Sequence, residues 1–442
     1  MRLEIENLAK IKHADIQIDG ITVIAGNNNT GKSTIGKTLY SVFNSLYNLN
    51  TKIEEQRESE IYRVCSHSIN NLRVAYRDDD GMIEWRNLRR YLEKAVEKII
   101  KYLMDASEEE VSREVYMNLF ESAYSEYNIL LSQNTVNEFV DATYEKISAI
   151  MQKDNFVVAK EIVERLFLQV FSPQIQCIGS KNENAKVSLL IKGAEIKLEF
   201  ENNKCKNLNM DYNILHEAFF IDDPFILDDI SNDNFYMTAS KGIRGQLKNR
   251  ISNTPDDDIM YRIFESVDAK EKLKVIFDIL NKVTEGDLFF QNGQCDFKNH
   301  QFNEPFNLEN LSAGVKSFVL IRLLLEKAIL KEKDVLILDE PEIHLHPEWQ
   351  LLYAEIVVLL QKEFDLSIVV TTHSINFLEA IEYYSKKYEI AEKSHYYLAV
   401  MDNNLAAFKD VTENLDEIYA QMVTPSMLLD KLKYEMENDG EE

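Results

Sequence analysis

The chain has 442 residues, of which 45% are hydrophobic and 28% charged, a composition typical of a globular protein and not of a mainly disordered one. Its 49 Lys and Arg against 75 Asp and Glu give a net charge of −26, which argues against a surface that coats nucleic acid indiscriminately but leaves room for one local basic groove. No stretch approaches the roughly 20 apolar residues that cross a bilayer, and the start has no apolar secretory core, so we expect a cytoplasmic protein without a membrane span.

The start of the chain predicts three strands and a glycine-rich loop. Residues 2–8, 14–18 and 21–24 have the apolar pattern of strands. The segment Gly26–Ser33 then reads Gly-Asn-Asn-Asn-Thr-Gly-Lys-Ser, which fits the phosphate-loop pattern GxxxxGK[ST] in full. It follows an apolar strand and opens a helical pattern, which is the context in which such a loop binds phosphate.

The residue types in this loop suit a nucleoside triphosphate. Gly26 and Gly31 allow a close approach of the backbone to phosphate, and the backbone N–H groups with the helix N-terminus attract an anion. Lys32 is expected to reach the β- and γ-phosphates, and the Ser33 hydroxyl to bind Mg²⁺. The predicted nucleotide-binding residues are Gly26, Asn27, Asn28, Asn29, Thr30, Gly31, Lys32, Ser33 and Thr34, with ATP and Mg²⁺ as cofactors.

The middle of the chain predicts a helical insertion. There is no glycine or proline between Gly81 and Pro173, and apolar residues such as Val96 and Ile99 recur at helical spacing. We expect several helices over residues 82–175 rather than one coiled coil, because no single heptad register is maintained. This insertion separates an N-terminal part of the domain, residues 1–81, from a second part, residues 176–385.

The second part begins with strands and ends in alternating helices and strands. A hairpin is expected around Gly193 and another around Asn292-Gly293, with an apolar strand at 218–221 and a helix at 257–284. The alternating elements imply a parallel sheet, and they are helix 312–330, strand 334–338, helix 347–363, strand 367–371 and helix 374–384. Residues 386–442 are expected to form a C-terminal helical segment with an acidic tail.

A second chemical signal stands at the end of strand 334–338. Asp339 and Glu340 follow four apolar residues, at the carboxyl end where open α/β sheets place their ligands. Asp339 is predicted to act with Ser33 in holding Mg²⁺, and Glu340 to orient and polarise the attacking water. Alone, such a strand end is often an ordinary loop, but together with the phosphate loop it predicts ATP hydrolysis.

Three more segments surround this strand, and they read LSAGVKS at 311–317, EIHLHP at 342–347 and TTHS at 371–374. With the phosphate loop they resemble the ATP-binding-cassette (ABC) ATPases, which carry a signature, a Walker B strand, a D-loop and a switch histidine in this order. The spellings look most like the SMC/RecF/OLD-related, AAA_15/AAA_21-like branch of bacterial ATPases. Many of those belong to anti-phage systems, such as Septu and PARIS. The motif resemblance covers residues 1–40 and about 285–385, and the signature departs from LSGGQ at Ala313 and Val315.

This resemblance implies an α/β P-loop NTPase with an ABC-type ATPase head and a helical insertion. By position, Ser312, Gly314 and Lys316 would face the γ-phosphate held by a second copy of the chain, so a homodimer would sandwich two ATP molecules. His373 would contact the γ-phosphate or the attacking water and would be catalytic together with Glu340. The implied function is an ATP-driven switch that controls a separate effector, such as a nuclease. A RecF-like repair ATPase that clamps DNA and a nucleotide-gated scaffold with little turnover are the alternatives.

Three weaker patterns have simpler explanations. Lys241, Arg244, Lys248 and Arg250 make the densest basic segment, which is either a solvated helix face or a contact for nucleic acid or a partner protein. Glu342, His344 and His346 alternate as metal ligands can, but the resemblance places them in the D-loop, which disfavours a dedicated metal site. Glu195 and Lys197 resemble the ExK of some nucleases, yet they lack an upstream Asp partner, and a solvent-facing strand is expected.

Overall fold

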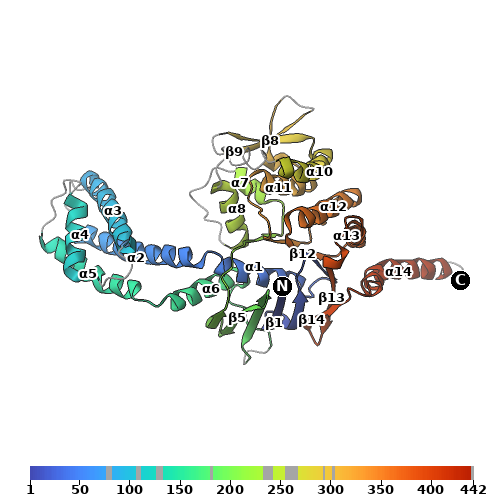
Figure 1. Ribbon diagram of the computed structural model, residues 1–442, viewed down its shortest axis with the longest axis horizontal. Coiled ribbons are helices and arrows are strands. Elements are labelled where there is room, and N and C mark those ends of the chain that lie inside the picture. The colour runs from blue at the N-terminus through green and yellow to red at the C-terminus, as the bar shows by residue number, and fades with distance from the viewer. Residues whose placement is uncertain are drawn as a thin grey trace. The chain divides into compact units, whose positions relative to one another are not determined.

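The computed structural model describes residues 1–75, 82–105, 111–125, 133–179, 183–231, 242–253, 267–291, 294–300 and 304–439. The chain divides into two compact units, a head made of Met1–Tyr47 with Val163–Glu442, and a helical unit, Asn48–Ile162. The predicted helical insertion is thus present (Figure 1). The helical unit begins at Asn48 and ends at Ile162, so both of its ends lie earlier in the chain than those of the range 82–175 expected from the sequence.

The head is organised by a sheet that, among the described residues, has 11 strands in the order β6-β5-β4-β1-β2-β14-β13-β3-β12-β11-β7. Its strands are β1 (Arg2–Leu8), β2 (Ile11–Gln17), β3 (Ile21–Gly26), β4 (Ala185–Ile191), β5 (Ala194–Glu201), β6 (Lys204–Met210), β7 (Ala218–Ile221), β11 (Val335–Asp339), β12 (Ser367–Thr372), β13 (Ser394–Asp402) and β14 (Leu405–Asp410). A smaller sheet contains β8 (Gly286–Gln291), β9 (Gln294–Asn299) and β10 (Phe306–Asn307).

Most helices of the head lie beside this sheet, whereas the last one extends away from it toward the C-terminus (Figure 1). The helices of the head are α1 (Lys32–Leu46), α7 (Ile226–Ser231), α8 (Ile243–Asn253), α10 (Val267–Thr284), α11 (Ala313–Glu326), α12 (Pro347–Phe364), α13 (Ile375–Lys387) and α14 (Asp416–Asp439). Two short 3-10 turns cover Leu308–Asn310 and Ala391–Lys393. No helix in the described ranges is both long and apolar enough to cross a membrane.

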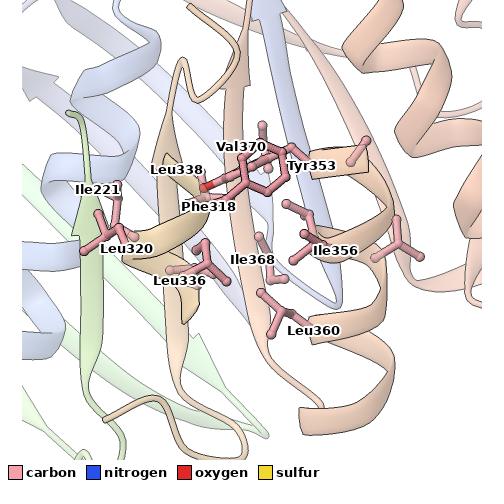
Figure 2. Packing of buried hydrophobic residues seen from close by; sticks show 14 of the residues in the cluster. Ile221, Phe318, Leu320, Leu336, Leu338, Tyr353, Ile356, Leu360, Ile368 and Val370 are labelled. Atoms are coloured by element: carbon pink, nitrogen blue, oxygen red, sulfur yellow. The ribbon is translucent and has the colours of Figure 1, made fainter. Parts of the chain in front are cut away.

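The central strands are parallel and buried on both faces. β12 pairs in parallel with β3 on one side and with β11 on the other, and β7 continues the parallel set. Because side chains alternate along a strand, Leu336 and Leu338 of β11 join the core formed with α11 and α12, which Figure 2 shows around Phe318. Ile337 faces α1, where a Cβ on Gly36 would lie 2.7 Å from it. The sequence-based prediction of an α/β fold is confirmed, and the strands of the alternating stretch are parallel as expected, whereas β1, β2, β4, β5 and β6 pair antiparallel in the same sheet.

The helical unit has its own core. It contains α2 (Leu49–Ala75), α3 (Met82–Asp105), α4 (Arg113–Ser125), α5 (Gln133–Met151) and the start of α6 (Asn155–Phe171). Phe120 of α4 stacks on Phe139 of α5 with ring centroids 4.4 Å apart, and both side chains are buried. Nearby, the Tyr116 and Thr143 hydroxyls are 2.9 Å apart, so the buried polar groups are paired. This unit therefore folds around apolar contacts between its own helices.

One sequence prediction is wrong in the C-terminal region. Residues 386–442 were expected to be helical, but β13 and β14 form an antiparallel hairpin within the main sheet, and only α14 follows as a long helix. The turn is at Asn403 and Asn404, which have φ values of 49° and 68°. Asparagine tolerates this left-handed region, so an Asn-Asn pair between two apolar runs is the hairpin signal that the helical expectation overlooked. β2 also begins earlier than predicted, at Ile11.

Candidate functional site

The phosphate loop lies between β3 and α1, as predicted. Gly26 has φ 147° and Gly31 has φ 79°, values that strain any residue with a side chain. A Cβ on Gly26 would also collide with the Ala399 carbonyl of the neighbouring β13. Both glycines are thus required by the backbone path that turns the strand into the helix, and this path leaves the loop N–H groups at the helix N-terminus.

Lys32 is the cation that this loop positions. Its side chain is 4% exposed, and Nζ donates to the carbonyls of Gly26 and Asn27 at 3.0 Å each. Nζ also lies 2.8 Å from Nε2 of His373 and 3.8 Å from Oε1 of Glu340. Burial lowers the pKa of the Lys32 ammonium, and the nearby carboxylates of Glu340 and Asp339 act in the opposite direction. A further anion bound beside Lys32 would therefore stabilise the charged form of its ammonium.

Two carboxylates end β11 beside the loop. The Thr371 hydroxyl of β12 donates to Oδ1 of Asp339 at 2.6 Å and accepts from the backbone N–H of Glu340 at 3.0 Å. Burial raises the pKa of Asp339, against the hydrogen bonds from Thr371 and Ser33. The Ser33 hydroxyl and the Asp339 carboxylate are thus adjacent, and such oxygen groups suit Mg²⁺. These residues fit the cofactor expected from the sequence.

His373 brings the third strand into the site. It follows β12, and its Nε2 lies 2.5 Å from Oε1 of Glu340. The ammonium of Lys32, the carboxylate of Glu340 and the imidazole of His373 therefore meet at one point on the carboxyl edge of the parallel strands. This is the edge at which open α/β sheets bind ligands. In the sequence Lys32 follows the loop after β3, Glu340 follows β11 and His373 follows β12, and the fold brings the three together.

The signature segment lies at the N-terminus of α11. Ser312 is exposed and caps the helix, its Oγ accepting from Val315 N at 3.4 Å. Gly314 is covered by the His344 carbonyl and the Trp349 ring, at 3.0 and 3.1 Å from the position of a Cβ. Within this chain Ser312 is therefore the accessible hydroxyl of the segment, at a helix N-terminus that favours an anion.

Lys316, grouped with Ser312 and Gly314 in the sequence prediction, has a different environment. Its side chain is 2% exposed, and Nζ donates to Oδ1 of Asp228 at 2.5 Å and to the Glu309 carbonyl at 3.0 Å. Nζ also lies 4.9 Å from the centre of the Phe225 ring. The structure places this ammonium inside the head, where it connects α11 to α7, and does not bring it to the surface beside Ser312.

The basic segment near α8 is partly neutralised within the head. Arg244 pairs with Asp222 and Asp223 at 3.1 Å, and Arg250 Nη2 lies 2.8 Å from the Glu217 carboxylate. Lys241 lies outside the described residues, and Lys248 is partly buried. Two of the four predicted contacts for nucleic acid therefore already have carboxylate partners.

Two residues of the site were missed from the sequence. Thr371 orients both Asp339 and Glu340, and its signal was a threonine near the end of a buried strand, two residues before His373. Glu342 was considered only as a metal ligand, but its side chain is 5% exposed and hydrogen-bonds the segment around His373. Over the described residues no group of three or more His, Cys, Asp and Glu side chains is arranged to hold a metal ion.

The phosphate loop joins β3 to α1, and the two carboxylates follow β11, which is separated from β3 in the sheet by β12 alone. This arrangement defines a P-loop nucleoside triphosphatase fold. The family model of the AAA ATPase domain, AAA_15, matches residues 1–378, and the chain belongs to this family. The matched range includes the phosphate loop, Asp339, Glu340 and His373. The family assignment supports ATP as the nucleotide.

Solved structures of SMC heads are similar in outline. An SMC head bound to the C-terminal winged-helix domain of ScpA has 12% identity and a TM-score of 0.42, covering 92% of this chain and 96% of that chain. The SMC head domain from Thermotoga maritima has 13% identity and a TM-score of 0.38, covering 93% and 98%. An SMC head with an extended coiled coil from Pyrococcus furiosus has 12% identity and a TM-score of 0.40, covering 95% and 98%. No curated protein matches the chain.

Proposed function

We propose that the chain binds ATP and hydrolyses it to ADP and phosphate. The observation that carries the proposal is the meeting of Lys32, Glu340 and His373, whose reactive atoms lie within 2.5 to 3.8 Å of one another. Phosphoryl transfer needs a cation on the β- and γ-phosphates, a group that orients water and donors for the developing charge. The three side chains match these needs.

The residues of the site then have distinct roles. Lys32 binds the β- and γ-phosphates, and the loop N–H groups hold the remaining phosphate oxygens. Glu340 orients the attacking water and accepts its hydrogen bond, and His373 holds Glu340 and donates toward the transferred phosphate. Ser33 and Asp339 would hold Mg²⁺, which when bound neutralises charge on the phosphate oxygens.

The exposed position of Ser312 supports a role for a second copy of the chain. In this proposal Ser312 and Gly314 of one copy approach the γ-phosphate bound by the other, so two heads close on two ATP molecules. ATP binding would then close the dimer and hydrolysis would open it, which makes the nucleotide a conformational switch.

We further propose that this switch controls a separate effector, such as a nuclease, in an anti-phage defence system. The apolar side chains of α14 support a protein partner, because more than half of the surface of Met427, Leu428, Leu429, Leu432 and Met436 is exposed. The alternative of a RecF-like ATPase that clamps DNA rests on the basic segment, where Arg244 and Arg250 are already paired. The other alternative, a scaffold that binds ATP with little turnover, predicts nucleotide binding without phosphate release.

The direct test compares nucleotide binding and phosphate release in three proteins. Lys32→Ala should abolish ATP binding, because it removes the cation that the loop holds. Lys12→Ala, an exposed lysine on β2, is the matched control and should leave both unchanged. Equal ATP binding by Lys32→Ala and the parent would refute the proposed site, and binding without phosphate release in the parent would favour the scaffold. ATP-dependent, tight binding of duplex DNA would favour the RecF-like alternative.

A further inference from the structure

Glu342 ties the D-loop to the switch histidine. Its Oε1 accepts hydrogen bonds from the Thr372 hydroxyl at 2.5 Å, the His373 N–H at 2.8 Å and the Ser374 N–H at 3.3 Å. These donors cover the end of β12 and the start of α13. One oxygen atom of the residue after Pro341 therefore fixes the backbone that carries the His373 imidazole.

A second side chain strengthens the same connection. The Ser374 hydroxyl donates to Oε1 of Gln350 at 2.6 Å, and Gln350 Nε2 donates back to the Leu345 carbonyl at 3.2 Å. Ser374 also caps α13 through the Phe377 N–H at 3.2 Å. The D-loop, α12 and the start of α13 are therefore joined by polar contacts beneath the site. Exposed Ile343 lies next to Glu342 in the same loop.

We propose that Glu342 is a positioning residue, which holds the backbone of His373 so that its Nε2 stays beside Oε1 of Glu340. This inference rests on the proposed ATP hydrolysis for its kinetic consequences. Glu342 touches neither Glu340 nor a phosphate in this role, and it acts only through His373. The residue thus couples the D-loop to the catalytic centre within one chain.

The carboxylate works here as an acceptor and not through its charge. In the described part of the chain Oε2 of Glu342 is buried and has no hydrogen-bond partner, so one oxygen makes all three contacts. Burial raises the pKa of this carboxyl, which is consistent with a role that does not need the ionised form. The metal-ligand alternative fits less well, because His344 and His346 are exposed whereas Glu342 is directed inward.

Two substitutions of Glu342 distinguish a role as hydrogen-bond acceptor from a role that depends on its negative charge. Glu342→Gln keeps an oxygen in the place of Oε1, so kcat should stay within about threefold of the parent. Glu342→Leu keeps a similar volume but offers no acceptor. It should lower kcat by roughly tenfold to a hundredfold, the size of effect expected when a reacting group is slightly misplaced. The dissociation constant for ATP should change little in both, which a general loss of structure would not produce.

A double-mutant cycle shows whether the effect passes through His373. In a His373→Ala background, Glu342→Leu should change kcat by less than about twofold, because coupled residues are not additive. An equal loss of kcat in both backgrounds would overturn the proposal. So would a Gln variant as slow as the Leu variant.

A final measurement does not depend on hydrolysis. The imidazole NMR signal of His373, identified by its loss in His373→Ala, should shift in Glu342→Leu and keep its parent position in Glu342→Gln. An unchanged signal in the Leu variant would overturn the positioning role even if ATP is hydrolysed. Failure of the proposed function appears separately, as equal ATP binding and phosphate release in the parent and Lys32→Ala, and the NMR comparison still decides the role of Glu342.

Discussion

Nε2 of His373 lies 2.5 Å from Oε1 of Glu340, although the two residues follow different strands. The register of the sheet explains this contact, because Asp339 of β11 is paired directly with Thr371 of β12. Each strand then continues past its last pair, so the residues that follow, Glu340 and His373, reach the same edge. A shift of β12 by one residue would exchange the faces of its side chains and take His373 away from Glu340.

Glu340→Gln should separate ATP binding from ATP hydrolysis. The amide keeps the size of the side chain but is a poor base, so hydrolysis should slow by about 10²- to 10⁴-fold while ATP still binds. The variant should accumulate as an ATP-bound dimer, seen by light scattering after size exclusion. Phosphate release at the parent rate would show that another group orients the water.

Ser312 should act on the ATP of a second copy. Asn28 and Asn310 are exposed near the phosphate loop and the signature, and they tolerate a cysteine better than Gly31 or Gly314, where a Cβ would be crowded. In Glu340→Gln chains with different tags, Asn28→Cys on one and Asn310→Cys on the other should crosslink only with ATP. Cys65, Cys177 and Cys205 are buried, and Cys295→Ser removes the remaining thiol.

Mixing experiments give an independent check of this arrangement. Lys32→Ala and Ser312→Arg chains should each be inactive alone, and a mixed dimer has one intact composite site. Some hydrolysis should therefore return on mixing if one site can act alone. Absence of crosslinks between differently tagged chains, in a variant that binds ATP, would rule out the two-head sandwich.

Asp339 should make the nucleotide-free chain less stable as pH rises. Burial raises its folded-state pKa above that of an unfolded aspartate, so between the two pKa values the folded chain holds more protons and loses stability with increasing pH. Asp339→Asn has no such titration. Its urea midpoint should exceed that of the parent at pH 8. This difference in midpoint should become smaller as the pH is lowered to about 4, the ordinary pKa of an aspartate.

The same substitution should remove the stabilisation of the chain by Mg²⁺ and ATP together, since it removes a predicted metal ligand. Asp211→Asn, at an exposed position, is the control and should change neither property. A lower urea midpoint for Asp339→Asn than for the parent at pH 8 would show that the Thr371 and Ser33 hydrogen bonds outweigh burial at this carboxylate.

The sequence identified the elements of the site well because each has a local backbone requirement. Gly26 and Gly31 must adopt positive φ, and the apolar strand that ends in Asp339 and Glu340 became informative because the phosphate loop stands in the same chain. Such signals lie within a few neighbouring residues, so they can be recognised without knowing the fold. The alternation of helices and strands similarly predicted the parallel order around β12.

Contacts between distant segments could not be predicted in this way. Lys316 has the sequence position of a signature residue, but its partner is Asp228, which comes from another part of the chain. Glu342 was interpreted through its neighbours His344 and His346, whereas its partners lie around His373. In both cases the environment of a charged side chain depends on packing between helices and strands that no local pattern encodes.

The purified chain should not cut nucleic acid by itself. Glu195 and Lys197 of β5 were the nearest match to a nuclease motif, but the Lys197 ammonium lies 2.7 Å from Glu195, which also accepts from the Ser188 hydroxyl at 2.8 Å. These hydrogen bonds, the one from Lys197 first, lower the pKa of the Glu195 carboxyl. Both groups are thus paired with each other on an open sheet surface.

The measurement is cleavage of plasmid DNA and of tRNA with Mg²⁺ or Mn²⁺. Three proteins are compared: the parent, Lys32→Ala, and a double variant of β5 that combines Glu195→Ala and Lys197→Ala. No cleavage is expected from any of them, because a nuclease site needs carboxylates that converge on a metal rather than on a lysine. Cleavage that persists in Lys32→Ala and disappears in the β5 variant would contradict this prediction and place the nuclease on the sheet surface. Cleavage equal in all three would instead point to a contaminant, which a further purification step with activity measured across the protein peak would reveal.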